Sequence, residues 1–300
     1  MQLLSQIKKD MEFNQGLYSL IDVLKSIAIS QYRSLENRIK QFEKFFIVLG
    51  GFFAMIDADK SDHPLINTQG RKQAVIAITS DSGLVGGLNT KVMNLALKEV
   101  RNNQAKLIVV GDRGKVYAQD SAIAVTAFGG IKDDTRLVQA EELRDYVMDQ
   151  ELRREMGALK IIYPYPLSIV SQAVGTLQLL PFSNAAIDKF QSQSSGSGFS
   201  SEERRAYPSG LVSELILESS PSDIAGYLAY LFLGHKLGEI FGLGRLAELS
   251  ARFAHLEDSK TKVEQLNKQL KMQYFRQRHE MIDRNMREIF ASRINLDKTY

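Results

Sequence analysis

The feature that most constrains the fold is a seven-residue repeat of apolar side chains at both ends of the chain. Near the N-terminus one register contains Ile7, Asn14, Ile21, Ala28, Leu35, Phe42 and Leu49, and a second contains Met11, Tyr18, Lys25, Tyr32, Ile39, Phe46 and Phe53. Near the other end the same spacing links Leu249, Leu256, Val263 and Leu270. Apolar residues at alternating steps of four and three form a seam, which a helix buries by supercoiling against another helix. We therefore predict that long N- and C-terminal helices form an antiparallel left-handed coiled coil.

The segment between these helices has the pattern of an inserted α/β domain. Branched apolar runs predict strands at 73–79, 106–110, 123–128, 160–163, 176–181 and 214–218. Helical patterns occupy 89–102, 111–119 and 139–155, and 191–201 is a loop rich in serine and glycine. Strands alternating with helices indicate a largely parallel, Rossmann-like sheet, and the Tyr163–Pro166 segment is interpreted as a rigid strand exit. The predicted domains are 1–60 (N-terminal helix), 71–219 (α/β domain) and 220–300 (C-terminal helix).

The C-terminal helix has a clear start in the sequence. Ser220 is a capping residue, Pro221 suits the first helical position, and Asp223 completes a capping pattern. Five glycines then weaken the first half of this helix by about 1 kcal/mol each relative to alanine. They are Gly226, Gly234, Gly238, Gly242 and Gly244. We expect a bend or break there, and a more regular helix after Leu246.

The composition excludes several classes of protein. The apolar content of 44% suffices for a packed core, but the longest apolar stretch is too short to span a bilayer, and no signal peptide is evident. The absence of cysteine excludes disulfides and thiolate metal sites. A net charge of +3 gives no argument for a nucleic-acid partner.

The segments that look chemical have simpler interpretations. Gly83–Thr90 follows a predicted strand, but its glycine spacing matches no phosphate-binding loop, so we favour a structural turn over nucleotide binding. The four histidines, His63, His235, His255 and His279, have no metal-ligand spacing. Carboxylates along 141–151 alternate with arginines, as on a solvated helix face. We therefore predict no catalytic residue, no cofactor and no metal.

Several motifs together resemble the gamma subunit of F-type ATP synthases, over nearly the whole chain. The Ile76–Thr90 segment looks like that family's strand–GLCGGLN–helix segment, with Val85 where cysteine is common. Ser171-Gln172 and Leu179-Leu180-Pro181 resemble its "SQ…LLP" strand pair. In the terminal helix, Glu248, Ala251 and Arg252 fit "E-x-x-A-R". Further matches there fall at Leu266, Leu270, Tyr274, Arg278, Ile282, Glu288 and Ile289.

The departures from the family pattern are concentrated in the two helices. His279, Asp283 and Asn285 stand where the family has Gln, Thr and Glu, and the first-helix signature is eroded over Leu17–Ala28. In this the chain looks like the divergent gamma subunits of alternative, N-type ATPases, several of which are thought to pump sodium.

The resemblance implies a mechanical function without catalysis. The two helices would enter the central cavity of an alpha–beta hexamer, while the α/β body would lie beside the epsilon subunit and the membrane c-ring. One copy per complex would couple ATP synthesis or hydrolysis to proton or sodium transport, as a peripheral protein on the cytoplasmic face of a bacterial inner membrane. The predicted contacts with the hexamer are Leu24, Lys25, Ser26, Ile27, Arg252, Arg278, His279, Asp283, Asn285 and Glu288. Lys25 places a charged residue in the seam register, which favours it as a contact. The alternative is that its side chain extends along the helix and reaches solvent with its ammonium group.

Two other classes of function stay open. A small-molecule-binding α/β enzyme with helical arms would hold its ligand at the Gly83 turn, so that substitutions there would abolish binding without damaging the fold. A coiled-coil adaptor unrelated to ATPases would form a stable homodimer.

Overall fold

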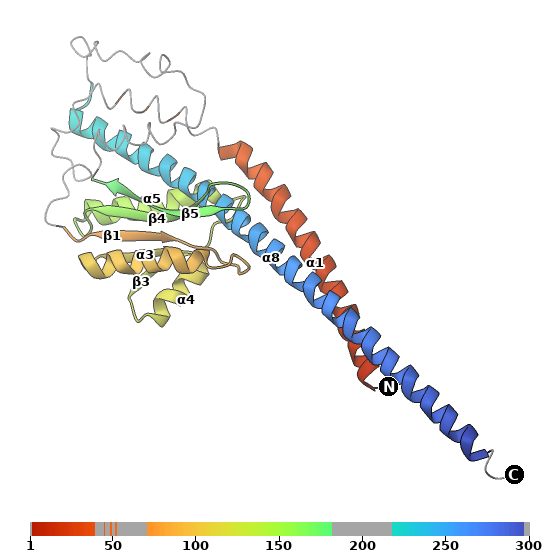
Figure 1. The fold of residues 1–300 in the computed structure, drawn as a ribbon. Helices are drawn as coiled ribbons and strands as arrows, with labels where there is room; N and C mark the ends of the chain where they lie inside the picture. Colours follow the sequence, from red (N-terminus) through yellow and green to blue (C-terminus); the bar gives the residue numbers. More distant parts are fainter. Residues whose placement is uncertain are drawn as a thin grey trace. The chain divides into compact units, whose positions relative to one another are not determined.

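The computed structural model describes residues 2–39, 45, 49, 52, 71–181 and 218–296. Helix α1 spans Gln2–Ile39 and helix α8 spans Pro221–Leu296, and between them lie five strands and three described helices (Figure 1). The chain divides into two compact units, one of residues 1–28 and 253–300 and the other of residues 29–252. Both terminal helices therefore contribute residues to each unit.

The second unit is built on a mixed sheet with the strand order β3-β2-β1-β4-β5. Strands β1 (Ala74–Ile78), β2 (Lys106–Val110), β3 (Val125–Phe128) and β4 (Leu159–Pro166) run parallel, as predicted. Strand β5 (Gln172–Leu180) is antiparallel to β4. The order of strands reverses at β1, which has β2 on one side and β4 on the other.

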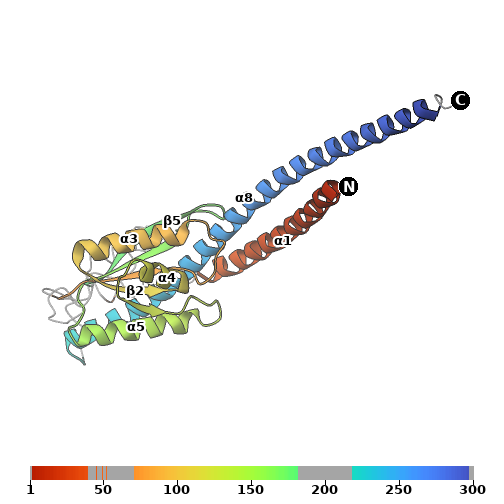
Figure 2. The same ribbon diagram turned by 90° about the horizontal axis from the view of Figure 1, so that it is seen from below.

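The two faces of the sheet are covered by different helices (Figure 2). Ile76, Ile108 and Ile161 point to a core that contains side chains of α5 (Arg136–Leu152) and of α8 between Ala225 and Phe241. Val75 and Val109 point the other way, toward α3 (Leu88–Asn103) and α4 (Asp112–Asp120). Every residue of β1 is buried, because a sheet covered on both faces requires a continuous apolar strand.

The interpretation of Tyr163–Pro166 as a strand exit was wrong, because these residues belong to β4. Pro164 pairs with Val174 of β5, and Pro166 pairs with Gln172. Pairing of β1 with β4 stops at Ile162, so beyond that residue β4 has an open side. A proline is tolerated at such a position, since its missing N–H removes no ladder hydrogen bond. The same pairing starts β5 at Gln172 rather than at the predicted Thr176.

We expected a bend or a break among the glycines of the C-terminal helix, and the break was wrong, because α8 is one continuous helix of 76 residues. Three of those glycines, Gly234, Gly242 and Gly244, lie where another element approaches closely. A Cβ on Gly242 would lie 2.8 Å from the Ile39 side chain, and one on Gly244 would lie 3.1 Å from Ile78 of β1. Tertiary packing therefore requires small residues there and outweighs their low helix propensity.

The start of α8 agrees with the sequence. The Ser220 hydroxyl donates to the Asp223 carboxylate at 2.7 Å and accepts from the Asp223 backbone N–H at 3.1 Å. The strand predicted at 214–218 falls almost entirely outside the described residues, and the loop predicted at 191–201 lies outside them altogether. Within the described part of the chain, no helix is both long and apolar enough to cross a bilayer.

Candidate functional site: the paired terminal helices

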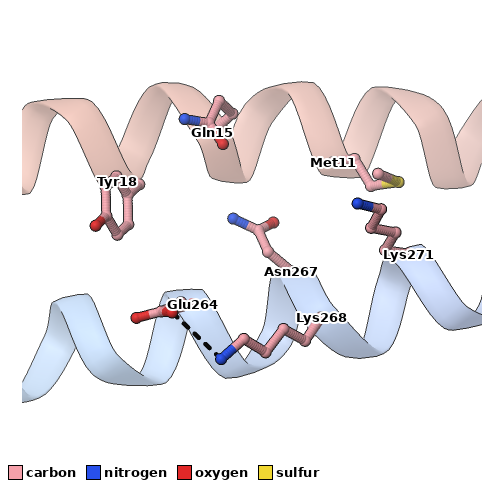
Figure 3. A pocket seen from close by; sticks show the side chains of 7 residues that line it. All are labelled: Met11, Gln15, Tyr18, Glu264, Asn267, Lys268 and Lys271. Atoms are coloured by element: carbon pink, nitrogen blue, oxygen red, sulfur yellow. Dashed lines mark ion pairs between the residues drawn. The ribbon is translucent and has the colours of Figure 1, made fainter.

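Within the first unit the first predicted register of α1 is buried, and the other predicted seam residues, Met11, Tyr18, Lys25, Val263 and Leu270, are half-buried. Ile7, Asn14, Ile21 and Ala28 of α1 are at most 8% exposed, and Leu256 of α8 is 2% exposed. Figure 3 shows the pairing: along the seam the α1 residues run from Tyr18 to Met11 as the α8 residues run from Glu264 to Lys271. The antiparallel pairing of the terminal helices is thus confirmed in this unit.

Lys25 occupies a seam position of α1, Lys260 lies between the seam residues Leu256 and Val263 of α8, and each lysine has an acidic partner on the other helix. Lys25 donates to Glu257 at 2.7 Å, and Lys260 donates to Asp22 at 2.5 Å. On each helix the acid precedes the lysine by three residues, so the two pairs face each other in the antiparallel arrangement. The Lys260 ammonium also lies 4.8 Å from the centroid of the Tyr18 ring. These four charged side chains, Asp22, Lys25, Glu257 and Lys260, form what we call the ion-pair clamp.

The clamp changes how its own groups titrate. The hydrogen bond and positive charge of Lys260 lower the pKa of Asp22, and the hydrogen bond to Asp22 raises the pKa of Lys260. Both groups are thus favoured in their charged forms at neutral pH. Lys25, which we predicted as a contact with a partner, has an intrachain partner here, and its side chain is only 19% exposed.

The seam is less well filled beyond the clamp. A cavity of about 370 Å³ is lined by Met11, Gln15, Tyr18, Glu264, Asn267, Lys268 and Lys271 (Figure 3). The Oδ1 atom of Asn267 is buried and accepts no hydrogen bond. Asn14, another seam residue, is 8% exposed. Polar side chains in a coiled-coil seam lower its stability, so this stretch is the weaker part of the pairing.

The remaining predicted contact residues of the first unit lie at or near the surface. Leu24 is half-buried, and Ser26 and Ile27 are exposed. On α8 all five predicted residues are exposed: Arg278, His279, Asp283, Asn285 and Glu288. Exposure is what contact with a partner requires, and the contacts themselves stay a prediction.

A second set of exposed side chains is apolar, and apart from Ile27 our sequence reasoning did not name its members as contacts. On α8 Phe275, Ile282 and Ile289 are 44%, 44% and 55% exposed and follow one another at seven-residue spacing. On α1 Phe13, Leu20 and Ile27 have the same spacing and are 71%, 54% and 48% exposed. This repeat is visible in the sequence, but of its members only Ile27 stood among the predicted contacts. Apolar side chains exposed in such rows are typical of a surface that another protein covers.

In the second unit, α8 packs against the segment that follows β1. Leu84 and Gly86 have left-handed backbone conformations, with φ of 64° and 57°. Val85 and Leu88 are buried and pack in a cluster with Ala247 and Ala251 of α8. Ligands of open α/β sheets bind outside the carboxyl ends of the strands, where the strand order reverses. Here α8 packs against that edge of β1, which supports a structural turn rather than a nucleotide site.

Polar contacts join the same two segments. Arg252 donates to Glu248 at 2.5 Å and to Ser82 at 2.6 Å. Glu248 also accepts from Arg245, which pairs in turn with Asp133 at 3.0 Å. Arg252, which we predicted as a contact with the hexamer, is therefore engaged inside its own unit, where it links α8 to the segment after β1.

Known proteins share this sequence pattern and fold. A family model described as ATP synthase matches residues 3–293. The chloroplastic ATP synthase gamma chain of Trieres chinensis is 24% identical to this chain in an alignment of 290 residues. The alignment covers 89% of this chain and 77% of the relative. The ATP synthase gamma chain of Clostridium beijerinckii is 22% identical in an alignment of 293 residues. That alignment covers 95% of this chain and 95% of the relative.

A solved structure has the same fold. It is a chain of the Euglena gracilis mitochondrial ATP synthase rotor in rotational state 1, with a TM-score of 0.63 and 17% identity. The match covers 94% of this chain and 99% of that chain. With the family model matched over almost its whole length, this chain belongs to the ATP synthase gamma-chain family.

Proposed function

We propose that this chain is the central shaft of a rotary ATP synthase or ATPase, and that it carries force without catalysing a reaction. The observation that carries the proposal is the antiparallel pair of α1 and α8, held by a buried seam and an ion-pair clamp, with rows of apolar side chains on its outer faces. A paired helix resists twisting better than a single one, because its seam side chains interlock.

In this proposal the helix pair occupies the central cavity of a hexamer of alpha and beta subunits. Rotation changes which catalytic site the shaft contacts, and these differential contacts shift each site among its conformations. The proposed contacts are those predicted from the sequence, namely Leu24, Lys25, Ser26, Ile27, Arg252, Arg278, His279, Asp283, Asn285 and Glu288. Lys25 and Arg252 would act mainly by holding the shaft together, since both are ion-paired within the chain.

The body of the second unit would bind the epsilon subunit and the c-ring, as a single copy attached to the cytoplasmic face of a bacterial inner membrane. This part of the proposal rests on membership of the ATP synthase gamma-chain family. The transported ion, proton or sodium, would be chosen by the c-ring, since no group of this chain is proposed to bind it.

Reconstitution tests the proposed function. Alpha and beta subunits from the same organism should form a hexamer whose sustained ATP hydrolysis requires this chain. Because the chain has no cysteine, one introduced cysteine can carry a probe whose rotation is followed in single complexes. A chain that forms a stable homodimer and does not bind the hexamer would instead support the alternative function, a coiled-coil adaptor unrelated to ATPases.

A further inference from the structure

The cavity between α1 and α8 contains two polar groups that have no partner in the described part of the chain. The Oδ1 atom of Asn267 is buried and accepts no hydrogen bond, and Figure 3 shows this side chain pointing from α8 into the gap between the helices. The Lys271 side chain reaches toward α1 beside Met11, and it forms no ion pair with a described residue. A buried acceptor without a donor is costly, so this position favours a bound group that donates a hydrogen bond.

The charge of the cavity favours an anion as its ligand. The charged residues of its lining are two lysines, Lys268 and Lys271, and one acid, Glu264. Glu264 and Lys268 form an ion pair at 3.3 Å on the same helix, which leaves Lys271 without an acidic partner in the lining (Figure 3). A carboxylate bound at the Lys271 ammonium would balance this charge through a charge-assisted hydrogen bond.

The spacing of the two unpartnered groups restricts the ligand further. Asn267 and Lys271 are four residues apart on α8, and side chains at that spacing are neighbours on one helix face. The ligand must therefore carry its hydrogen-bond donor close to its carboxylate. An α-hydroxy acid has this arrangement, because its hydroxyl and its carboxylate are on adjacent carbon atoms. An α-amino acid has it as well, but its ammonium group would be repelled by the charge of Lys271.

The α1 side of the cavity offers apolar surface. Met11 and the ring of Tyr18 line it, together with the Gln15 amide (Figure 3). Thioether and aromatic side chains pack well against an apolar group of a ligand, and the thioether adapts to its shape. The volume of about 370 Å³ lies within the range of small-molecule sites. The cavity therefore has room for an organic acid with an apolar side chain.

We propose that this cavity binds a small α-hydroxy acid with an apolar side chain. The carboxylate of the ligand binds the Lys271 ammonium, its hydroxyl donates to Asn267 Oδ1, and its apolar side chain packs on Met11 and Tyr18. Because the ligand contacts both helices, it binds only when they are paired, and it stabilises the pairing at the stretch where the seam is least well filled. The inference goes beyond the proposed function and does not depend on it, since both walls of the cavity belong to one chain.

Titration of the full chain with phenyllactate, an α-hydroxy acid with an aromatic side chain, tests the proposal. Calorimetry should give a dissociation constant of about 2 mM or lower for a ligand of this size. The thermal unfolding midpoint should rise with the concentration of phenyllactate. Phenylpropionate lacks the hydroxyl and should bind about fivefold more weakly or worse, because it leaves Asn267 Oδ1 without a donor. Phenylalanine should also bind more weakly than phenyllactate, because its ammonium lies beside Lys271.

Two variants of the full chain locate the site. Lys271→Met removes the charge and keeps an apolar side chain, and Asn267→Leu removes the unpartnered oxygen and fills part of the cavity. Each should weaken the binding of phenyllactate about tenfold or more. Lys262→Met is the matched control, because it removes the same charge from an exposed position of α8 where the lysine pairs with Asp258, and its affinity should equal that of the parent chain. Circular dichroism should show the same helix content in all four chains.

Several results would overturn the proposal. If phenyllactate does not bind to the parent chain at about 20 mM, ten times the expected constant, the cavity contains only water. Equal affinities for phenyllactate and phenylpropionate would show that the hydroxyl is not recognised, and equal or tighter binding of phenylalanine would show that the ligand class is wrong. Unchanged affinity in either Lys271→Met or Asn267→Leu would place the ligand elsewhere on the chain. The comparison of the three ligands uses the parent chain alone, so it decides the question even if a variant does not fold.

Discussion

At the scale of single residues, Glu151 is the most unusual group in the described part of the molecule. It lies at the end of α5, is 0% exposed, and has one carboxylate oxygen without a hydrogen-bond partner. Its other oxygen accepts from Arg71 at 3.1 Å. Burial raises the pKa of Glu151 to about 7, and the charge of Arg71 only partly opposes this. The ionised carboxylate is therefore destabilised in the folded state.

The resulting pH dependence has a definite sign. The pKa is higher in the folded chain than its ordinary value of 4.5, so folding takes up a proton between about pH 4.5 and about 7. Stability should fall as pH rises through this window, by about 3 kcal/mol, and stay lower above it. Glu151→Gln should remove this slope and raise the denaturation midpoint at pH 8. Glu155→Gln, at an exposed position, is the control. Equal pH profiles for parent and Glu151→Gln chains would contradict the assignment.

At the scale of elements, the ion-pair clamp should contribute measurably to the pairing of α1 with α8. Lys25→Glu places a negative charge near Asp22 and Glu257, and Glu257→Lys places a positive charge near Lys25 and Lys260. Each single change should lower the free energy of unfolding by about 1 kcal/mol, and the double change should recover most of it. Chemical denaturation of the four chains measures this coupling. A double variant as unstable as the sum of the singles would show that the two groups do not interact.

The glycines of the two long helices should respond in opposite ways to alanine. A Cβ added at Gly16 of α1 would meet no neighbouring atom within 4 Å, so Gly16→Ala should stabilise the helix by about 1 kcal/mol. Gly242 of α8 lies against Ile39, so Gly242→Ala should destabilise by about 1–3 kcal/mol despite its better propensity. The thermal unfolding midpoints of the two variants, compared with that of the parent chain, measure both effects. A stabilising Gly242→Ala would mean that Ile39 can move aside.

These elements also show what a sequence can and cannot predict. The heptads predicted the helix pairing because a seam buried between two helices leaves a period in each one. Helix propensity gave the wrong prediction at Gly242. A glycine is needed there because the side chain of Ile39, about 200 residues away in sequence, packs against it. Propensity failed again at Pro164, where the end of a neighbouring strand makes the missing N–H harmless. In the candidate site, Lys25 was singled out for its charge, yet its partner Glu257 is visible only once the helices are in register.

At the scale of the whole molecule, the exposed apolar rows should make the isolated chain prone to association. Replacing Phe275, Ile282 and Ile289 by serine should keep the chain monomeric at higher concentration, because it removes the exposed apolar row of α8. The thermal midpoint should hardly change, since these side chains contribute little to the core. Light scattering against concentration measures the effect. Unchanged scattering would place the association elsewhere on the surface.

The position of α8 in the chain has a consequence for biosynthesis. The five strands of the described sheet precede Pro221, yet one of its faces is covered by α8 residues between Ala225 and Phe241. While the ribosome is still translating the codons for these residues, of the described helices only α5 can cover the face that carries Ile76, Ile108 and Ile161. Domains usually fold as units once their sequence has emerged. This one must wait for its last helix, and until then it depends on whatever shields apolar surface at the ribosomal exit.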